Sequence, residues 1–331
     1  MNKMPYLRMQ GYELVSHYQG CLGSQEIILG SRGPCRFCSA TNPKKFRTKS
    51  HTIAEGLGNK WLISLDECDD CNKKFQLYDD ALCKSVGVIL TLGGVLGKKN
   101  KTRKTGRTKD GHNIRHIKDD NGRHISFGAL DLSKLSSLTG TTLSFGGKSL
   151  TLHYPSPPEY FIPKHAYKAL VKAGLAALPK NDLKDYSKLL SWIQNPQNEE
   201  DFPVLEVAFS VGNLGNSPQI ASVSILRRKI DNSGAFHSIA VICVGSCCWA
   251  LDLKPDLLDN HLPPILSGAI KINWSTILGI EPNTMEIKYR DLTHFNWADN
   301  NSRLTPVEAL KISFNYETTE GVFIPKYRSM Q

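Results

Sequence analysis

Residues 35 to 71 contain the densest set of side chains that could do chemistry. Two Cys-x-x-Cys pairs, Cys35 with Cys38 and Cys68 with Cys71, are separated by 29 residues. Each pair can offer two thiolates to one metal ion, and two pairs complete a tetrahedral four-sulfur site that needs no water. The sequence therefore predicts a structural zinc ion held by these four cysteines, whose binding contributes directly to folding.

The distance between the two pairs exceeds the roughly 15 to 20 residues of a simple zinc ribbon. An inserted β-hairpin that turns around Gly56–Lys60 would account for the excess. A thiol-redox site is the alternative, although it needs one Cys-x-x-Cys at a helix start in a βαβ setting. The other five cysteines are left out of the site. Cys21 and Cys83 have no partner motif, and Cys243, Cys247 and Cys248 lie in an apolar segment typical of core packing.

His51 lies between the cysteine pairs in the segment KSHTIAEGLGNK, and Glu55 follows it four residues later. Four thiolates fill a zinc site without a histidine, so His51 belongs to a second site or to the surface. Taken alone, a histidine on a polar hairpin is more often a hydrogen-bonded surface residue than a catalytic base. Further polar residues follow in the same region: Asn59, Asp66, Glu67 and Asn72.

The order of these residues resembles that of the HNH, or ββα-metal, endonucleases. The segments CRFC and KSHTIAEGLGNKWLISLDECDDCNKKF, within residues 35–75, are similar to the variety whose core is held by two Cys-x-x-Cys pairs. Four cysteines, a histidine, a glutamate, Leu-Gly, an asparagine and a phenylalanine all occur in the family's order. The resemblance covers roughly residues 31–105, about a quarter of the chain.

This resemblance implies a metal-dependent endonuclease that hydrolyses phosphodiester bonds in DNA, with a role in restriction or phage defence. His51 would be the general base, a task suited to a pKa near neutrality. Asn72 and Glu55 would hold or position a catalytic Mg²⁺ or Mn²⁺ ion. Asn72 at a helix start could instead be only a cap.

Two departures from the family pattern stand out. Ser50 replaces the acidic ligand that often precedes the histidine, and Ala54 replaces a proline. Glu55, Asp66 or Glu67 would have to compensate for the missing charge. A catalytically inactive zinc-ribbon protein that only binds nucleic acid therefore stays the alternative.

The net charge of +10 is unevenly placed. Residues 1–125 contain 22 Lys and Arg against 12 Asp and Glu, whereas the remaining residues have 19 of each sign. This asymmetry favours a polyanion-binding front part followed by a neutral body. The densest basic run follows the nuclease-like segment and predicts phosphate contacts to double-stranded DNA from seven residues: Lys98, Lys99, Lys101, Arg103, Lys104, Arg107 and Lys109.

The fold class expected is α+β, with a ββα-metal core followed by a separate α+β domain. Residues 1–111 would form the nuclease-like domain with its basic arm, 112–153 a β-rich connection, and 154–331 the second domain, helices first and then an antiparallel sheet. Phe75, Tyr78, Leu82, Val86 and Ile89 recur at helical spacing, which predicts a helix that begins near Asp69 or Cys71.

No apolar run is long enough to span a membrane, and the first residues lack the apolar core of a signal peptide. We therefore expect a cytoplasmic protein whose thiols are kept reduced. Homo-oligomerisation and the role of the back half are left open by the sequence.

Overall fold

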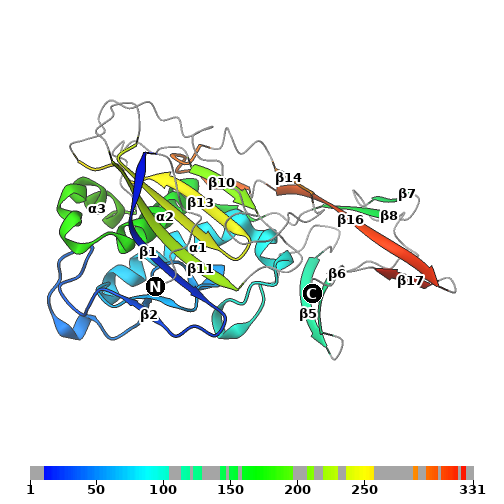
Figure 1. Ribbon diagram of the computed structural model, residues 1–331, viewed down its shortest axis with the longest axis horizontal. Helices are drawn as coiled ribbons and strands as arrows, with labels where there is room; N and C mark the ends of the chain where they lie inside the picture. Colours follow the sequence, from blue (N-terminus) through cyan, green and yellow to red (C-terminus); the bar gives the residue numbers. More distant parts are fainter. Residues whose placement is uncertain are drawn as a thin grey trace.

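The computed structural model describes residues 11–103, 113–119, 122–128, 142–146, 149–155, 159–196, 207–211, 219–229, 236–256, 286–289, 296–304, 307–319 and 322–325. Within these ranges the protein is a mixed α+β structure, with few helices and mainly antiparallel sheets (Figure 1).

The front part is a small sheet followed by a long helix. Strands β2 (Ile27–Leu29), β3 (Ser50–His51) and β4 (Leu62–Ser64) align in the order β2-β4-β3. β3 runs antiparallel to β4, and β2 runs parallel to it. Two short 3-10 turns, η1 (Pro43–Lys45) and η2 (Glu55–Leu57), lie before β3 and between β3 and β4.

Helix α1 (Asp69–Leu92) begins at the residue that the sequence pattern indicated. All five apolar residues of the predicted stripe are buried: Phe75, Tyr78, Leu82, Val86 and Ile89. Asp69 and Asp70 lie in the first turn, where negative charge favours the helix N-terminus. The backbone departs from helical geometry at Gly87, so the helix is kinked near its end.

A five-stranded antiparallel sheet forms the larger layer. Its order is β1-β11-β12-β13-β10, made of β1 (Tyr12–Cys21), β10 (Val207–Val211), β11 (Ile220–Arg228), β12 (Ser238–Val244) and β13 (Cys247–Asp252). The three inner strands are buried nearly throughout. β1 comes from the front third of the chain and pairs with β11 over almost its whole length.

Helix α2 (Pro163–Ala177) lies against one face of this sheet, and α1 packs on α2 (Figure 1). The 3-10 segment η5 (Lys180–Tyr186) joins α2 to α3 (Ser187–Gln194). Helix α2 approaches the sheet closely. At Gly174 of α2 a Cβ atom would lie 2.9 Å from Leu253 and 3.0 Å from Ala240. Alanine at this position would therefore push α2 away from the sheet.

One hydrophobic core runs through both halves of the chain. It includes Leu57 and Phe75 from the front, Leu170 from α2, and Ile225 and Trp249 from the sheet. This cluster of buried residues contains members from both sides of residue 154, where the second domain is expected to begin. The shared core arises because α2 packs between α1 and the sheet, while β1 closes one sheet edge.

The remaining strands build smaller sheets. β7 (Thr142–Gly146), β8 (Ser149–Pro155), β14 (Glu286–Tyr289), β16 (Val307–Thr319) and β17 (Val322–Pro325) form a second antiparallel sheet that extends away from the first (Figure 1). β5 (Asn113–Asp119) pairs with β6 (Gly122–Gly128), β9 (Tyr160–Phe161) pairs with β15 (Arg303–Leu304), and a short 3-10 turn, η3 (Lys98–Asn100), precedes them. Every helix in the described ranges is too short or too polar to cross a membrane.

The cysteines of the back half are buried, as their apolar setting indicates. Cys243 and Cys248 face each other on paired strands β12 and β13 and are joined as a disulfide. The sequence does not predict this bond, because apolar composition does not reveal the strand register that places Cys243 opposite Cys248. Cys247 is a buried free thiol, Cys83 is a buried thiol of α1, and Cys21 is exposed at the end of β1.

Candidate functional site

The four cysteines of the two Cys-x-x-Cys pairs come together as predicted. Their Sγ atoms all lie within 4.8 Å of one another, with 3.9 Å between Cys35 and Cys71 and 3.6 Å between Cys38 and Cys68. A tetrahedron with Zn–S bonds of about 2.3 Å has edges of about 3.8 Å. The four sulfurs therefore already have the spacing that one zinc ion requires.

Hydrogen-bond donors lie beside two sulfurs of the cluster. The backbone N–H of Cys68 donates to Cys35 Sγ at 3.4 Å, and Gln194 Nε2 donates to Cys71 Sγ at 3.5 Å. The Cys71 thiol and backbone N–H groups lower the pKa of Cys35 to about 4, against the opposing effect of burial. Burial raises the pKa of Cys68 to about 11, and the neighbouring Cys35 sulfur raises that of Cys71. The residues present thus fit a structural zinc ion in spacing and in ligand type.

Arg36 joins this cluster to the rest of the molecule. Arg36 lies between Cys35 and Cys38 along the chain, and its side chain is almost fully buried. Its Nε donates to Asp66 at 2.9 Å, and one Nη donates to the carbonyls of Leu175 and Leu178 at the end of α2. Asp66 is therefore held in a buried ion pair.

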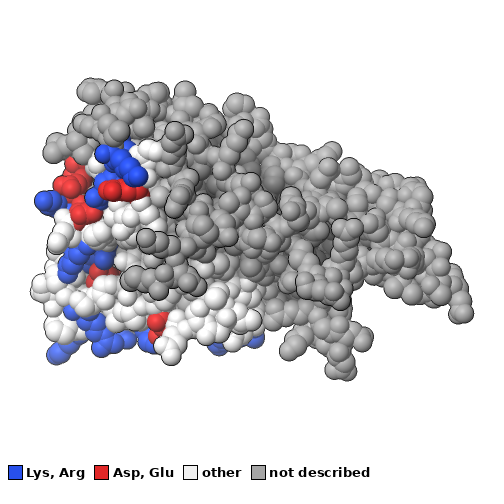
Figure 2. Space-filling view, viewed as in Figure 1, with Lys and Arg blue, Asp and Glu red and all other residues white. Residues whose placement is uncertain are grey.

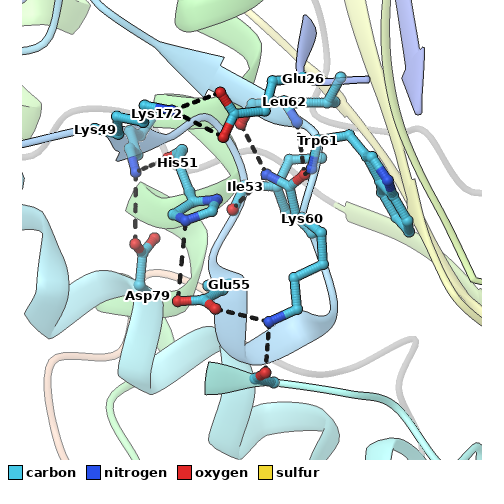
Figure 3. A network of polar contacts seen from close by, with 12 residues as sticks. Glu26, Lys49, His51, Ile53, Glu55, Lys60, Trp61, Leu62, Asp79 and Lys172 are labelled. Carbon is cyan, nitrogen blue, oxygen red and sulfur yellow. Dashed lines mark hydrogen bonds and ion pairs between the residues drawn. The ribbon is translucent and has the colours of Figure 1, made fainter. Parts of the chain in front are cut away.

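His51 and Glu55 form the second site, and they come from consecutive short elements. His51 is the last residue of β3 and Glu55 the first of η2. His51 Nε2 lies 3.9 Å from Glu55 Oε2, and about a quarter of each side chain is exposed (Figure 3). The imidazole and the carboxylate thus share a position that solvent can reach.

Asn59 closes the loop that carries both residues. Its side-chain amide donates to the carbonyls of Ile53 and Leu62, and its Oδ1 accepts from the backbone N–H groups of Trp61 and Leu62. Gly58 beside it has φ of +105°, a conformation that glycine adopts without strain. The sequence pattern alone assigns Asn59 no role, although its position between Leu57-Gly58 and a strand is typical of a turn residue that bonds to nearby backbone groups.

Charged neighbours tune the pair. Burial lowers the pKa of His51, the nearby Glu55 opposes this, and the cations of Lys172 and Lys60 add to the lowering. Burial acts to raise the pKa of Glu55, but the hydrogen bond from Lys60 Nζ at 2.7 Å and its charge lower it on balance. At neutral pH the site therefore holds a neutral imidazole beside a carboxylate.

The other expected residues of this site lie differently. Asn72, in the first turns of α1, donates its backbone N–H to Cys68, and its side chain makes no hydrogen bond within the described ranges. It is not the cap either, since Cys68 is at that position. Glu67 is fully buried beside Lys172, and burial raises its pKa to about 8. Ser50 is buried as well.

Asp79 of α1 is an acidic neighbour that sequence reasoning missed. Lys172 Nζ lies 3.5 Å from Asp79 Oδ2 and donates to the His51 carbonyl at 2.8 Å (Figure 3). Burial raises the pKa of Asp79, and the charges of Lys172 and Lys98 oppose this. No group of three His, Cys, Asp or Glu within the described ranges other than the four cysteines is close enough to hold a metal ion. His51, Glu55 and Asp79 therefore do not form a preassembled three-ligand site.

The start of the basic run is attached to the same loop. Lys60 Nζ donates to the Gly97 carbonyl as well as to Glu55, and Lys98, Lys99 and Lys101 are exposed directly after Gly97. Arg103 differs because it pairs with Glu159 at 2.6 Å. Lys104, Arg107 and Lys109 lie outside the described residues.

A second basic segment, residues 44–49, carries compensated charge. Lys45 pairs with Asp70, Arg47 with Asp69, and Lys49 with Glu26. On the face shown in Figure 2, basic and acidic side chains are accordingly interspersed over the described part of the chain. The turn at 98–101 is therefore the better candidate for phosphate contact.

Comparisons with protein-family models, with curated proteins and with solved structures find no match to this chain. The geometry of the two sites is therefore the basis for any functional assignment.

Proposed function

We propose that this chain is a metal-dependent endonuclease of the HNH type, which hydrolyses phosphodiester bonds in DNA. The observation that carries the proposal is the pairing of His51 with Glu55 on a loop closed by Asn59, next to a four-cysteine cluster. The cluster would hold a structural zinc ion, and the exposed lysines at 98, 99 and 101 would contact phosphates on either side of the cleaved bond.

In this proposal His51 accepts the proton of the attacking water. A general base must be unprotonated to act, and burial lowers the pKa of His51, which keeps the imidazole neutral at neutral pH. Its Nδ1 atom is buried, so Nε2 would accept this proton, and Glu55, 3.9 Å from Nε2, would stabilise the imidazolium that forms. The site therefore has a base and a group that supports its charged form.

Glu55 would also be the main protein ligand of a catalytic divalent ion. Magnesium is commonly bound through only one or two carboxylates together with substrate phosphates and water, which suits a site without three preassembled ligands. When bound there, the ion would stabilise negative charge on the phosphate and the leaving oxygen. Ser50 does not supply this charge, and Asp66 and Glu67 are occupied elsewhere.

The test is cleavage of supercoiled plasmid DNA with Mg²⁺ or Mn²⁺ by the whole chain and by His51→Ala. We expect the variant to lose at least about 100-fold in rate, as expected for removal of a general base. His237→Ala is the control histidine, because His237 lies beside Ser238 of β12 and outside the residues proposed for catalysis. Equal activity of His51→Ala and the wild type would contradict the catalytic role of His51.

A binding protein without catalysis is the second candidate. It is favoured by Ser50 and by the absence, in the described ranges, of any group of three metal ligands other than the four cysteines. It predicts DNA binding that weakens steeply with salt and no cleavage with any divalent ion. That combination of results would replace the nuclease proposal.

A further inference from the structure

Helix α2 buries three lysines, and two of them, Lys168 and Lys172, lie four residues apart and are completely shielded from solvent. Transferring an ammonium group out of water is unfavourable unless it is paired or hydrogen-bonded. Each lysine must therefore have partners that offset the loss of solvation, and the two sets of partners differ.

Lys168 donates hydrogen bonds within the back half and lies against aromatic rings. Its Nζ donates to the carbonyls of Trp192 and Asn195 at 3.1 and 2.6 Å, and it lies 4.4 Å from the centre of the Trp192 ring. From the front part, the Tyr78 ring lies 5.5 Å away. Lys168 thus ties α2 to the end of α3.

Lys172 reaches the His51 site instead. Its Nζ donates to the His51 carbonyl at 2.8 Å and lies 3.5 Å from Asp79 (Figure 3). It also lies 3.8 Å from Glu67. These three partners come from β3, from α1 and from the segment before α1. One side chain of the back half therefore joins three separate pieces of the front part.

The His51 carbonyl needs such a partner because β3 is only two residues long. Its pairing with β4 extends over Ser50 and His51, and then Thr52 donates to Leu62. A charged donor forms a stronger hydrogen bond than a neutral one. Lys172 therefore fixes the backbone that carries the imidazole more firmly than the short ladder alone.

We propose that Lys172 is a positioning residue for His51, through which α2 of the back half completes the catalytic core. The catalytic meaning of this inference rests on the proposed endonuclease function, whereas its structural meaning does not. The charged groups around His51 then have separate tasks. Glu55 faces the ring, Lys60 holds Glu55, and Lys172 holds the backbone and Asp79.

The test compares Lys172→Met with Lys168→Met, two changes of the same kind in two buried lysines of one helix. Both should lower the melting temperature, since both leave buried polar groups without a partner. Only Lys172→Met should lower kcat for DNA cleavage, by about 10- to 100-fold with little change in KM, because a displaced base reacts slowly. Lys172→Arg, which keeps a buried cation and donor, should recover part of the rate.

Hydrogen–deuterium exchange of the peptide covering residues 50–58 gives a reading that does not depend on activity. It should rise in Lys172→Met and stay at the wild-type level in Lys168→Met. If Lys172→Met does not fold, the double variant Lys172→Met with Glu67→Gln removes one of the buried acids left without a cation. We expect this double variant to fold and to show the same fall in kcat and the same rise in exchange.

The outcomes separate the two proposals. Equal kcat and equal exchange for the two single variants would overturn the positioning role of Lys172. A wild-type protein that cleaves no nucleic acid would overturn the proposed function, while the exchange measurement would still decide whether Lys172 fixes the His51 backbone.

Discussion

At the scale of single residues, His51 shows how one side chain is prepared by several weak effects. Burial removes water from the ring and favours its neutral form, while Glu55 favours the charged form from 3.9 Å. Lys60 is bonded to that same carboxylate and so reduces its pull on the imidazole. The balance lies on the neutral side, which suits a base that must be free to accept a proton.

This balance predicts the acid limb of the pH profile. The pKa of His51 is lowered from the ordinary value of 6.5, so the neutral base persists at lower pH than for a solvated histidine. For the whole chain with a saturating divalent ion, kcat/KM for DNA cleavage should reach half of its maximum below pH 6.5. Glu55→Gln removes the group that opposes the lowering, and should move the midpoint lower still. A wild-type midpoint above 6.5 would contradict the prediction.

At the scale of elements, the four-cysteine cluster holds the loop of residues 35–38 against the start of α1. Phe37 packs edge-on against Phe75 at 4.9 Å, and both are buried. Little regular secondary structure lies between β2 and β3, where the η1 turn stands alone. The cluster therefore takes the place of a hydrogen-bonded ladder in this segment.

We accordingly predict one zinc ion per chain, and loss of stability when it is removed. Cys38→Ser changes the one exposed cysteine of the cluster, so its effect should come from lost coordination more than from lost packing. We expect this variant to hold less than one equivalent of zinc by elemental analysis and to melt at a lower temperature. Cys21→Ser, which changes an exposed cysteine outside the cluster, should keep both values. Full zinc content in Cys38→Ser would argue against the site.

Local pattern predicted some elements well. The helical spacing of Phe75, Tyr78 and Leu82 indicated the buried face of α1, because burial of a stripe repeats with the helix period. The burial of Lys168 and Lys172 could not be predicted in this way. Lysines four residues apart on an amphipathic helix indicate a solvated face, and only the tertiary partners of these two lysines make it an inner one.

The same limit applies to the candidate site. The spacing of cysteines, His51 and Glu55 can be read along the chain, since those residues lie within about one motif. Asp79 and Lys172 come to His51 from two different helices, so no local pattern indicates them. Likewise the pairing of β1 with β11 joins segments about 200 residues apart, and register between such segments is set by the assembled fold.

At the scale of the whole molecule, the front part contacts the back half in several places. β1 is a strand of the sheet otherwise built from residues 207–252, Arg36 donates to carbonyls at the end of α2, and Lys172 fills the space beside His51. Tyr78 of α1 also donates its hydroxyl to Ile193 at the end of α3. These contacts make the back half part of the folding unit that supports the site.

The fragment 1–111, which the sequence pattern suggests as a domain, should therefore not fold cooperatively. Without the back half, β1 loses β11 and the buried side of α1 is exposed to water, which favours association of the apolar surface. We expect the fragment to bind zinc through its four cysteines, but to show no cooperative thermal transition and to bind a hydrophobic dye. The full chain treated identically is the control. A fragment that melts cooperatively near the temperature of the full chain would show that the front part is an independent domain, and that Arg36 and Lys172 contribute little to its fold.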